Sequence, residues 1–147
     1  MSVTKTVRIE AEMNDSFQVS ADIRGHKVFI DQPAGGGGQD AGPTPLEYFL
    51  FSLAGCIATI GRIAAMQKKI ELKRFAVSVE GDYDPAGLLG KETENRSGFQ
   101  VMRVTAEIEA NGMSSIEKQA FLDEVCDRCP LHDNIKMATA VVHTLAE

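Results

Sequence analysis

The chain has no tryptophan and few aromatic residues, with two tyrosines and seven phenylalanines among 147 residues. Neither a base-stacking platform nor a sugar-binding face is suggested by this composition. Basic residues are also scarce: 15 lysines and arginines stand against 21 acidic residues, the net charge is −6, and the basic residues are scattered. Because a nucleic-acid partner requires a basic face, we expect none.

A signal-peptide core at the start of the chain and an even number of cysteines are missing as well. The first ten residues contain no apolar core of the length that a signal peptide needs, so we expect a cytoplasmic protein. Three cysteines are an odd number, and cysteines in a reducing compartment are more often catalytic, redox-active or metal-binding than part of a disulfide framework. The length and the absence of repeats predict one domain over residues 1–147.

The most distinctive stretch is an uncharged segment of thirteen residues, 48–60. Thr44 and Glu47 before it have the spacing of a capping box, and Lys68 and Lys69 after it complement the negative end of a helix. Thirteen residues are fewer than the about twenty that cross a bilayer. A helix that is apolar on nearly every face is buried on nearly every face, so we expect a central core helix and no membrane partner.

Alternating and β-branched residues predict strands on both sides of this helix. The predicted strands are residues 3–10, 17–24, 27–31, 72–83, 99–109 and 138–146, with a helix as the competing interpretation for the last. Four glycines, 35–38, predict a flexible loop and not a phosphate cradle, because no Lys-Ser/Thr pair follows them. Ser114 and Glu117 form a second capping box, and Pro130 interrupts this second helix or opens a short new one.

Residues 17–24 and 27–31 form one predicted hairpin, with its turn at Gly25 and His26, and residues 72–83 and 99–109 form another. Hairpins with helices between them are typical of the α+β class. These few strands cannot cover so apolar a helix, which favours an obligate homodimer that shares its core.

Cys56 lies inside the apolar helix, and by itself a free cysteine is as often a small buried hydrophobe. Cys129 follows seventy-three residues later, with Cys126 three positions before it and His132 three positions after it. A thioredoxin-like motif belongs at a helix start, whereas this Cys-x-x-Cys lies at a helix end. Zinc bound by these three residues and Cys56 is a second interpretation, although the usual second Cys-x-x-Cys pair is missing.

Two segments together carry a family resemblance. A Pro-x-Pro-hydrophobic-Glu helix start, residues 43–47, precedes Cys56 in a helix rich in glycine and alanine, and a distant Cys129-Pro130 pair follows. This combination resembles the OsmC/Ohr family of osmotically induced and organic hydroperoxide resistance proteins, over roughly residues 17–146. The resemblance implies an α+β fold with antiparallel hairpins wrapped around the central apolar helix, in an intertwined homodimer without a bound cofactor or metal.

The resemblance also implies a thiol peroxidase. Cys56 is then the peroxidatic nucleophile that becomes a sulfenic acid, and Cys129 resolves it as a disulfide. Organic hydroperoxides are the implied substrates, and a small dithiol of the lipoyl type is the implied reductant.

A buried thiol needs a nearby cation, which the family supplies as an arginine held by a glutamate. Arg24 is our first candidate, with Arg62 and Arg128 as others, and Glu47 is the candidate carboxylate. The peroxidase pattern has its glutamate ten residues before the cysteine, where this chain has Leu46. Nine residues along a helix correspond to a rotation of about 900° and a rise of about 13 Å, so Glu47 lies on the face opposite Cys56 and cannot contact it directly in a straight helix of the same chain. A helix-capping role is therefore the alternative for Glu47.

Two other functions remain open. One is a non-peroxidase family member that binds a small thiol or a hydrophobic ligand at the dimer interface. The other is a structural domain with buried cysteines, in which neither Cys56 nor Cys129 reacts faster than a model thiol.

Overall fold

The structure, a computed structural model, describes residues 2–146 in two compact units that divide after Phe49. Within these residues it contains three α-helices, one short 3-10 helix and two antiparallel sheets, which confirms the predicted α+β class. The assignment of residues 1–147 to a single domain stays a prediction.

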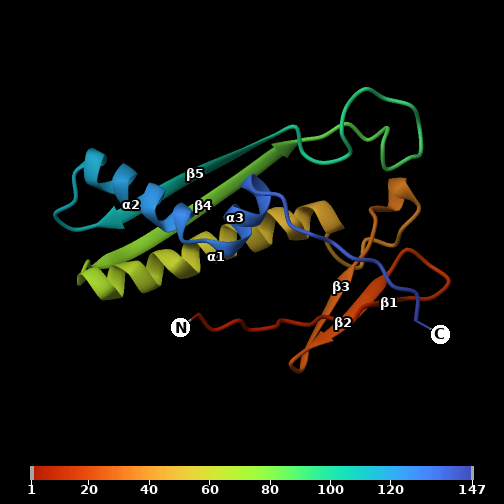
Figure 1. Cartoon of the computed structure of the whole chain (residues 1–147), viewed down its shortest axis with the longest axis horizontal. Helices are drawn as coiled ribbons and strands as arrows, with labels where there is room; N and C mark the ends of the chain where they lie inside the picture. The colour runs from red at the N-terminus through yellow and green to blue at the C-terminus, as the bar shows by residue number, and fades with distance from the viewer. Residues whose placement is uncertain (1, 147) are drawn as a thin grey trace. The chain divides into compact units, whose positions relative to one another are not determined.

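The first unit contains a three-stranded antiparallel sheet in the order β1-β2-β3 (Figure 1). Its strands are β1 (Glu12–Met13), β2 (Val19–Ile23) and β3 (His26–Ile30). The hairpin predicted from residues 17–24 and 27–31 is therefore confirmed, with Val19 opposite Ile30. The strand predicted at residues 3–10 is wrong, because this exposed segment has β-branched residues but no ladder partner among the described residues.

A two-residue turn joins β2 to β3. Arg24 and Gly25 both have positive φ, 55° and 88°, as a type I′ hairpin turn requires. The Asp22 carboxylate accepts a hydrogen bond of 2.7 Å from the Gly25 N–H. Arg24 therefore occupies the tip of a tight hairpin, one residue earlier than the turn that the sequence predicted.

The glycine-rich loop is held by one buried carboxylate. Asp31 is 1% exposed and accepts hydrogen bonds from the backbone N–H groups of Gln32, Gln39 and Ala41 at 2.7, 3.2 and 3.1 Å. These bonds, that of Ala41 foremost, lower the pKa of Asp31. A Cβ at Gly38 would lie 2.1 Å from the Gln32 carbonyl oxygen, so the close return of the loop requires a glycine. The loop contains the 3-10 helix η1 (Ala34–Gly36).

The central helix α1 spans Pro45–Lys68 and begins as predicted. The Thr44 N–H donates to the Glu47 carboxylate at 2.7 Å, and the Glu47 N–H donates to the Thr44 hydroxyl at 3.3 Å, which is a complete capping box. By length and composition α1 is able to cross a membrane, because its 24 residues include a window with a mean hydropathy of 1.8. The thirteen uncharged residues therefore understate the apolar length of α1. A core helix satisfies the same criterion.

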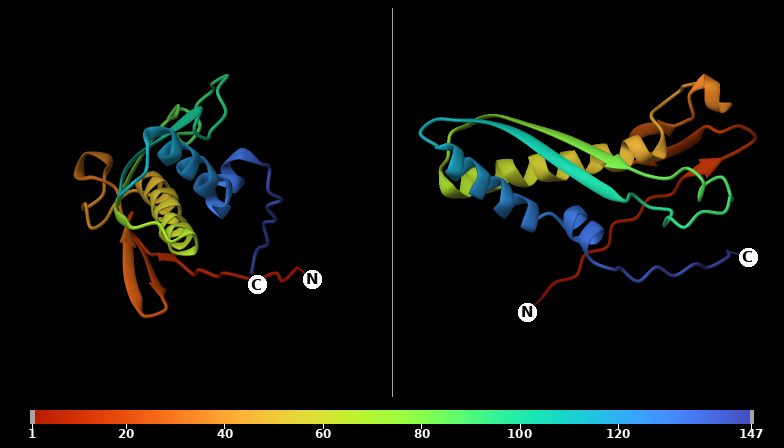
Figure 2. Two further views of the ribbon diagram at one scale, coloured as in Figure 1. Left: turned by 90° about the vertical axis from the view of Figure 1, so that its left-hand side faces the viewer. Right: turned by 90° about the horizontal axis from the view of Figure 1, so that it is seen from above.

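In the second unit, two long strands and two helices accompany α1 (Figures 1 and 2). The elements are β4 (Leu72–Asp82), β5 (Val101–Ala110), α2 (Ser115–Asp127) and α3 (Pro130–Lys136). β4 and β5 pair as the predicted antiparallel hairpin, with Asp82 opposite Val101. Ser114 and Glu117 form the predicted capping box, and Pro130 opens a new helix.

The core of the second unit lies where α1 and α2 meet one face of the β4–β5 hairpin. Its fully buried side chains include Ile57 of α1 and Val125 of α2. Gly61 allows the hairpin to approach α1, because a Cβ there would lie 2.1 Å from the Phe75 ring. Cys129 belongs to the same core, and Cys56 packs against it, so the packing of this core determines the position of both candidate cysteines.

Residues 137–146 form neither a helix nor a strand, so the predicted closing strand is wrong, and so is the helix alternative. Val141, Val142 and Leu145 are exposed. The alternation of their sequence supplies strand propensity, but a strand is stable only against a neighbouring edge. Within the described residues, this segment pairs with no strand of either sheet.

Candidate active site

Cys56 lies near the middle of α1, on the side of the helix that packs against the core of the second unit. It is a free, half-buried thiol between Gly55 and the fully buried Ile57. Leu53, which the apolar spacing of the helix also directs inward, is buried in the same core. The helix therefore holds the sulfur in an apolar environment with partial access.

Cys129 is the N-cap of α3 and is 1% exposed. The cysteine has an extended backbone, Pro130 follows at the first helical position, and the Cys129 sulfur accepts a hydrogen bond of 3.4 Å from the His132 N–H. This capping role was not predicted from the sequence. The signal was present, because a short polar side chain directly before a proline at a helix start is typical of an N-cap.

The two sulfurs meet. The thiol groups of Cys129 and Cys56 are hydrogen-bonded to each other, with the sulfur atoms 3.0 Å apart, across 73 residues of sequence. A disulfide bond is about 2.05 Å long, so a movement of about 1 Å would bring the pair to bonding distance. The arrangement permits one thiol to attack the other once the latter is oxidised.

The surroundings of Cys56 oppose its ionisation. Burial, the hydrogen bond with Cys129 and the charge of that residue raise the pKa of Cys56 to about 11, and a backbone hydrogen bond from Leu131 acts in the opposite direction. No positively charged side chain contributes to this pKa within residues 2–146. The thiolate therefore needs stabilisation beyond that which the second unit provides.

The arginines of the second unit that were candidates have other partners. Arg62 donates to the Leu72 carbonyl at 2.8 Å. Arg128 donates to Gln67 at 3.0 Å and forms an ion pair with Glu124 at 3.5 Å. The structure thus brings neither guanidinium to the thiols.

The remaining predicted site residues, Arg24 and Glu47, belong to the first unit, whereas both thiols belong to the second. Arg24 lies at the β2–β3 turn, and Glu47 caps α1. The capping role of Glu47 is therefore established, and a role for either residue in activating Cys56 stays a prediction.

Cys126 lies in the last turn of α2 and is half-buried. Burial raises its pKa, and the charges of Cys129, Asp123 and Asp127 act in the same direction. His132 contributes its backbone N–H to Cys129. Among residues 2–146, no three histidine, cysteine or acidic side chains cluster as metal ligands, so the zinc interpretation gains no support.

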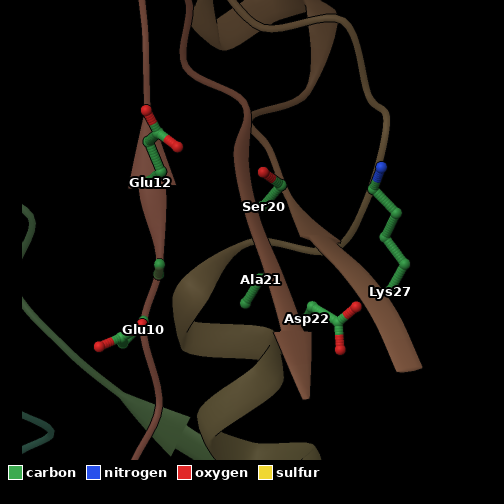
Figure 3. A pocket seen from close by; sticks show the side chains of 7 residues that line it. Glu10, Glu12, Ser20, Ala21, Asp22 and Lys27 are labelled. Carbon is green, nitrogen blue, oxygen red and sulfur yellow. The ribbon is translucent and has the colours of Figure 1, made fainter. Parts of the chain in front are cut away.

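The first unit contains a separate open cavity of about 330 Å³ (Figure 3). Its labelled side chains include Glu10 just before β1, Glu12 on β1, Asp22 on β2 and Lys27 on β3. Glu10 already pairs with Arg8 at 2.6 Å. The cavity carries no nucleophilic thiol, and we do not assign the chemistry to it.

Comparison with known proteins places the fold. A family model described as OsmC-like protein matches residues 36–144. A solved OsmC-like protein from Mycoplasma pneumoniae is 23% identical, with 92% of this chain and 91% of that chain covered and a TM-score of 0.78. No curated protein matches the chain.

Two further solved structures are named for hydroperoxide resistance. The organic hydroperoxide resistance protein OsmC from Legionella pneumophila is 20% identical, with 92% of each chain covered and a TM-score of 0.65. The organic hydroperoxide resistance protein OhrB of Bacillus subtilis is 17% identical, with 91% and 93% covered and a TM-score of 0.59. At these identities the structures establish the fold, which confirms the OsmC-like architecture that the sequence predicted.

Proposed function

The chain belongs to the OsmC-like protein family, and from that membership we propose that it is a thiol-dependent peroxidase that reduces organic hydroperoxides. The observation that carries the proposal is the 3.0 Å separation of Cys56 Sγ and Cys129 Sγ. Two structural neighbours that are named for hydroperoxide resistance support the substrate class. Antioxidant defence and stress response are the corresponding biological roles, and we propose the cytoplasm as the location, where thiols stay reduced.

The reaction has two steps within the protein. The Cys56 thiolate attacks the hydroperoxide, the O–O bond breaks, an alcohol leaves after protonation, and Cys56 becomes a sulfenic acid. The Cys129 thiolate then attacks the Cys56 sulfur, forms the disulfide, and displaces hydroxide, which leaves as water. Backbone N–H groups of the first turn of α3 support both sulfurs, since Leu131 hydrogen-bonds Cys56 and His132 donates to Cys129.

An external dithiol of the lipoyl type completes the cycle. One of its sulfurs attacks the protein disulfide, and its second sulfur releases the reduced protein by exchange. A dithiol suits this task because the second attack is intramolecular and therefore fast.

One observation favours a second function. Because the pKa of Cys56 is raised to about 11 by its surroundings in the second unit, the resting thiol is protonated at neutral pH. A family member that only binds a small thiol or a hydrophobic ligand at this site needs no thiolate. The two functions differ in whether hydroperoxide oxidises Cys56 rapidly.

The test is stoichiometric oxidation. We expect one equivalent of cumene hydroperoxide to remove two hydrogens from the reduced protein within seconds, in a bridge that peptide mapping assigns to Cys56 and Cys129. The resolving step is fast because the two sulfurs are already in contact, so the rate of bridge formation reports the reaction of Cys56 with the hydroperoxide. Slow oxidation spread over all three cysteines would contradict the peroxidase and favour the binding function.

We also propose the homodimer, from an exposed strip on α1. Phe51, Gly55, Thr59, Ile63 and Met66 recur at helical spacing and are exposed, Phe51 and Met66 each at 71%. A glycine inside a helix costs roughly 0.5–1 kcal/mol relative to alanine. Among the described residues, no atom lies within 4 Å of the Cβ that a substitution at Gly55 would add, so this position leaves room for the close approach of a second copy.

Phe51→Glu tests the dimer. We expect light scattering to give twice the 15.9 kDa chain mass for the unaltered protein. The variant should dissociate at least about tenfold more readily, because a buried aromatic anchor is replaced by a charge. Ile116→Glu is the matched control, since Ile116 is exposed on α2 and outside the strip. Equal dissociation of both variants would exclude the strip as the interface.

A further inference from the structure

The peroxidase reaction leaves one thiol unused. Cys126 is half-buried in the last turn of α2, three residues before Cys129. Its neighbour Cys129 is 1% exposed, so a Cys56–Cys129 disulfide would present one of its two sulfurs poorly to an external reductant. A thiol within the protein is not subject to this restriction.

The backbone between Cys126 and Cys129 forms a tight turn. The Cys129 N–H donates to the Cys126 carbonyl at 3.1 Å, and Arg128 has φ −88° and ψ −8°. These are the values of the third residue of a type I turn, in which the first and fourth Cα atoms lie within about 7 Å. Disulfides join residues whose Cα atoms are about 4.4–6.8 Å apart, so the turn brings the two cysteines into the range for a bridge.

We propose that Cys126 is a third redox thiol, which takes over the disulfide after Cys129 has resolved Cys56. The proposal rests on the peroxidase function above. The Cys126 thiolate attacks Cys129 Sγ, the Cys126–Cys129 bond forms, and the Cys56–Cys129 bond breaks. Cys56 leaves as a thiolate and takes up the proton that Cys126 released, so no electron enters or leaves the protein in this step.

The exchange has two consequences for the cycle. It returns Cys56 to the reduced state, with the Leu131 backbone hydrogen bond available to the departing sulfur. It also moves the disulfide from α1 to the turn between α2 and α3, where the half-buried Cys126 is the sulfur that an external dithiol can attack. Disulfides that are strained or accessible are the ones most readily reduced.

The order of the two bridges tests the proposal. The full-length protein is treated with one equivalent of cumene hydroperoxide, quenched with acid at increasing times, alkylated and digested with trypsin. Cleavage after Arg128 separates Cys126 from Cys129, so the two disulfides give different linked peptides. We expect the Cys56–Cys129 bridge to appear first and to be replaced by Cys126–Cys129, with Cys56 again free.

A monothiol probe and a second variant complete the test. In the oxidised protein, 2-mercaptoethanol should form its mixed disulfide on Cys126, and in Cys126→Ser it should move to Cys56. A Cys56–Cys129 bridge that persists in the unaltered protein would overturn the third thiol and leave the peroxidase intact. A Cys126–Cys129 bridge that forms equally fast in Cys56→Ser would also overturn it, because Cys56 would then be unnecessary. If Cys56 is never oxidised, both proposals are wrong.

Discussion

Replacing Cys56 by serine is expected to lower the rate of hydroperoxide reduction by roughly three orders of magnitude or more, because the residue is the proposed nucleophile. A serine hydroxyl can still share a hydrogen bond with Cys129, so the packing of α1 against α3 should survive. It cannot take up oxygen from a peroxide as sulfur does. The measurement is steady-state turnover of cumene hydroperoxide with a dithiol reductant, together with the unfolding midpoint of both proteins.

Cys129→Ser is the matched control, since it makes the same chemical change 3.0 Å away. This variant should complete one turnover and then accumulate a Cys56 sulfenic acid, which dimedone traps and mass spectrometry detects. The two substitutions therefore separate the nucleophile from the resolving thiol. Retention of more than about a tenth of the activity by Cys56→Ser would place the chemistry elsewhere.

The local signals in the sequence predicted the fold well. Both capping boxes, Thr44 with Glu47 and Ser114 with Glu117, form as their spacing indicates, because their hydrogen bonds join residues three positions apart. Both hairpins also form, since each depends on alternation along neighbouring segments. These features require no information about distant parts of the chain.

The two wrong strands show where local signals are insufficient. Residues 3–10 and 138–146 carry β-branched residues but form no ladder within the described chain. A strand's stability lies in its cross-strand pairs and not in its own propensity. Both segments expose apolar side chains, among them Val7 and Val142, which agrees with the proposed dimer if the second copy covers them.

Local sequence patterns predicted the candidate site less well than the fold. Nothing in the spacing of Cys56 and Cys129 predicts contact across 73 residues, and the family resemblance alone suggested the pair. Their contact depends on how α2 and α3 return along α1, which is a property of core packing. From the apolar character of the helix, the sequence predicts that the pKa of Cys56 is raised, but not by how much.

The step that most limits the proposed chemistry is the ionisation of Cys56, which needs a nearby cation. With a pKa of about 11, roughly one Cys56 in ten thousand is a thiolate at pH 7. An adjacent positive charge lowers a thiol pKa by about 1–3 units. If Arg24 supplies this charge, Arg24→Gln should lower the rate of Cys56 oxidation at pH 7 by about 10- to 1000-fold.

The pH profile separates this role from a structural one. A raised thiol pKa keeps the unreactive protonated form up to higher pH, so the loss in Arg24→Gln should shrink as the pH rises toward about 11. Stopped-flow measurement of Cys56 oxidation from pH 6 to 10 records this convergence. Arg8→Gln is the matched control, because Arg8 is an exposed arginine of the same unit that pairs with Glu10. Equal profiles for the two variants would exclude Arg24.

Glu47→Gln distinguishes the capping role of Glu47 from the predicted role in holding Arg24. Glutamine at this position still accepts the hydrogen bond from the Thr44 N–H, so the capping box and the unfolding midpoint should be retained. The negative charge that would hold Arg24 is lost, and we expect the rate of Cys56 oxidation at pH 7 to fall without any loss of stability. A variant with unchanged rate and unchanged stability would leave Glu47 as a helix cap alone, and the orientation of Arg24 would then have to come from another group.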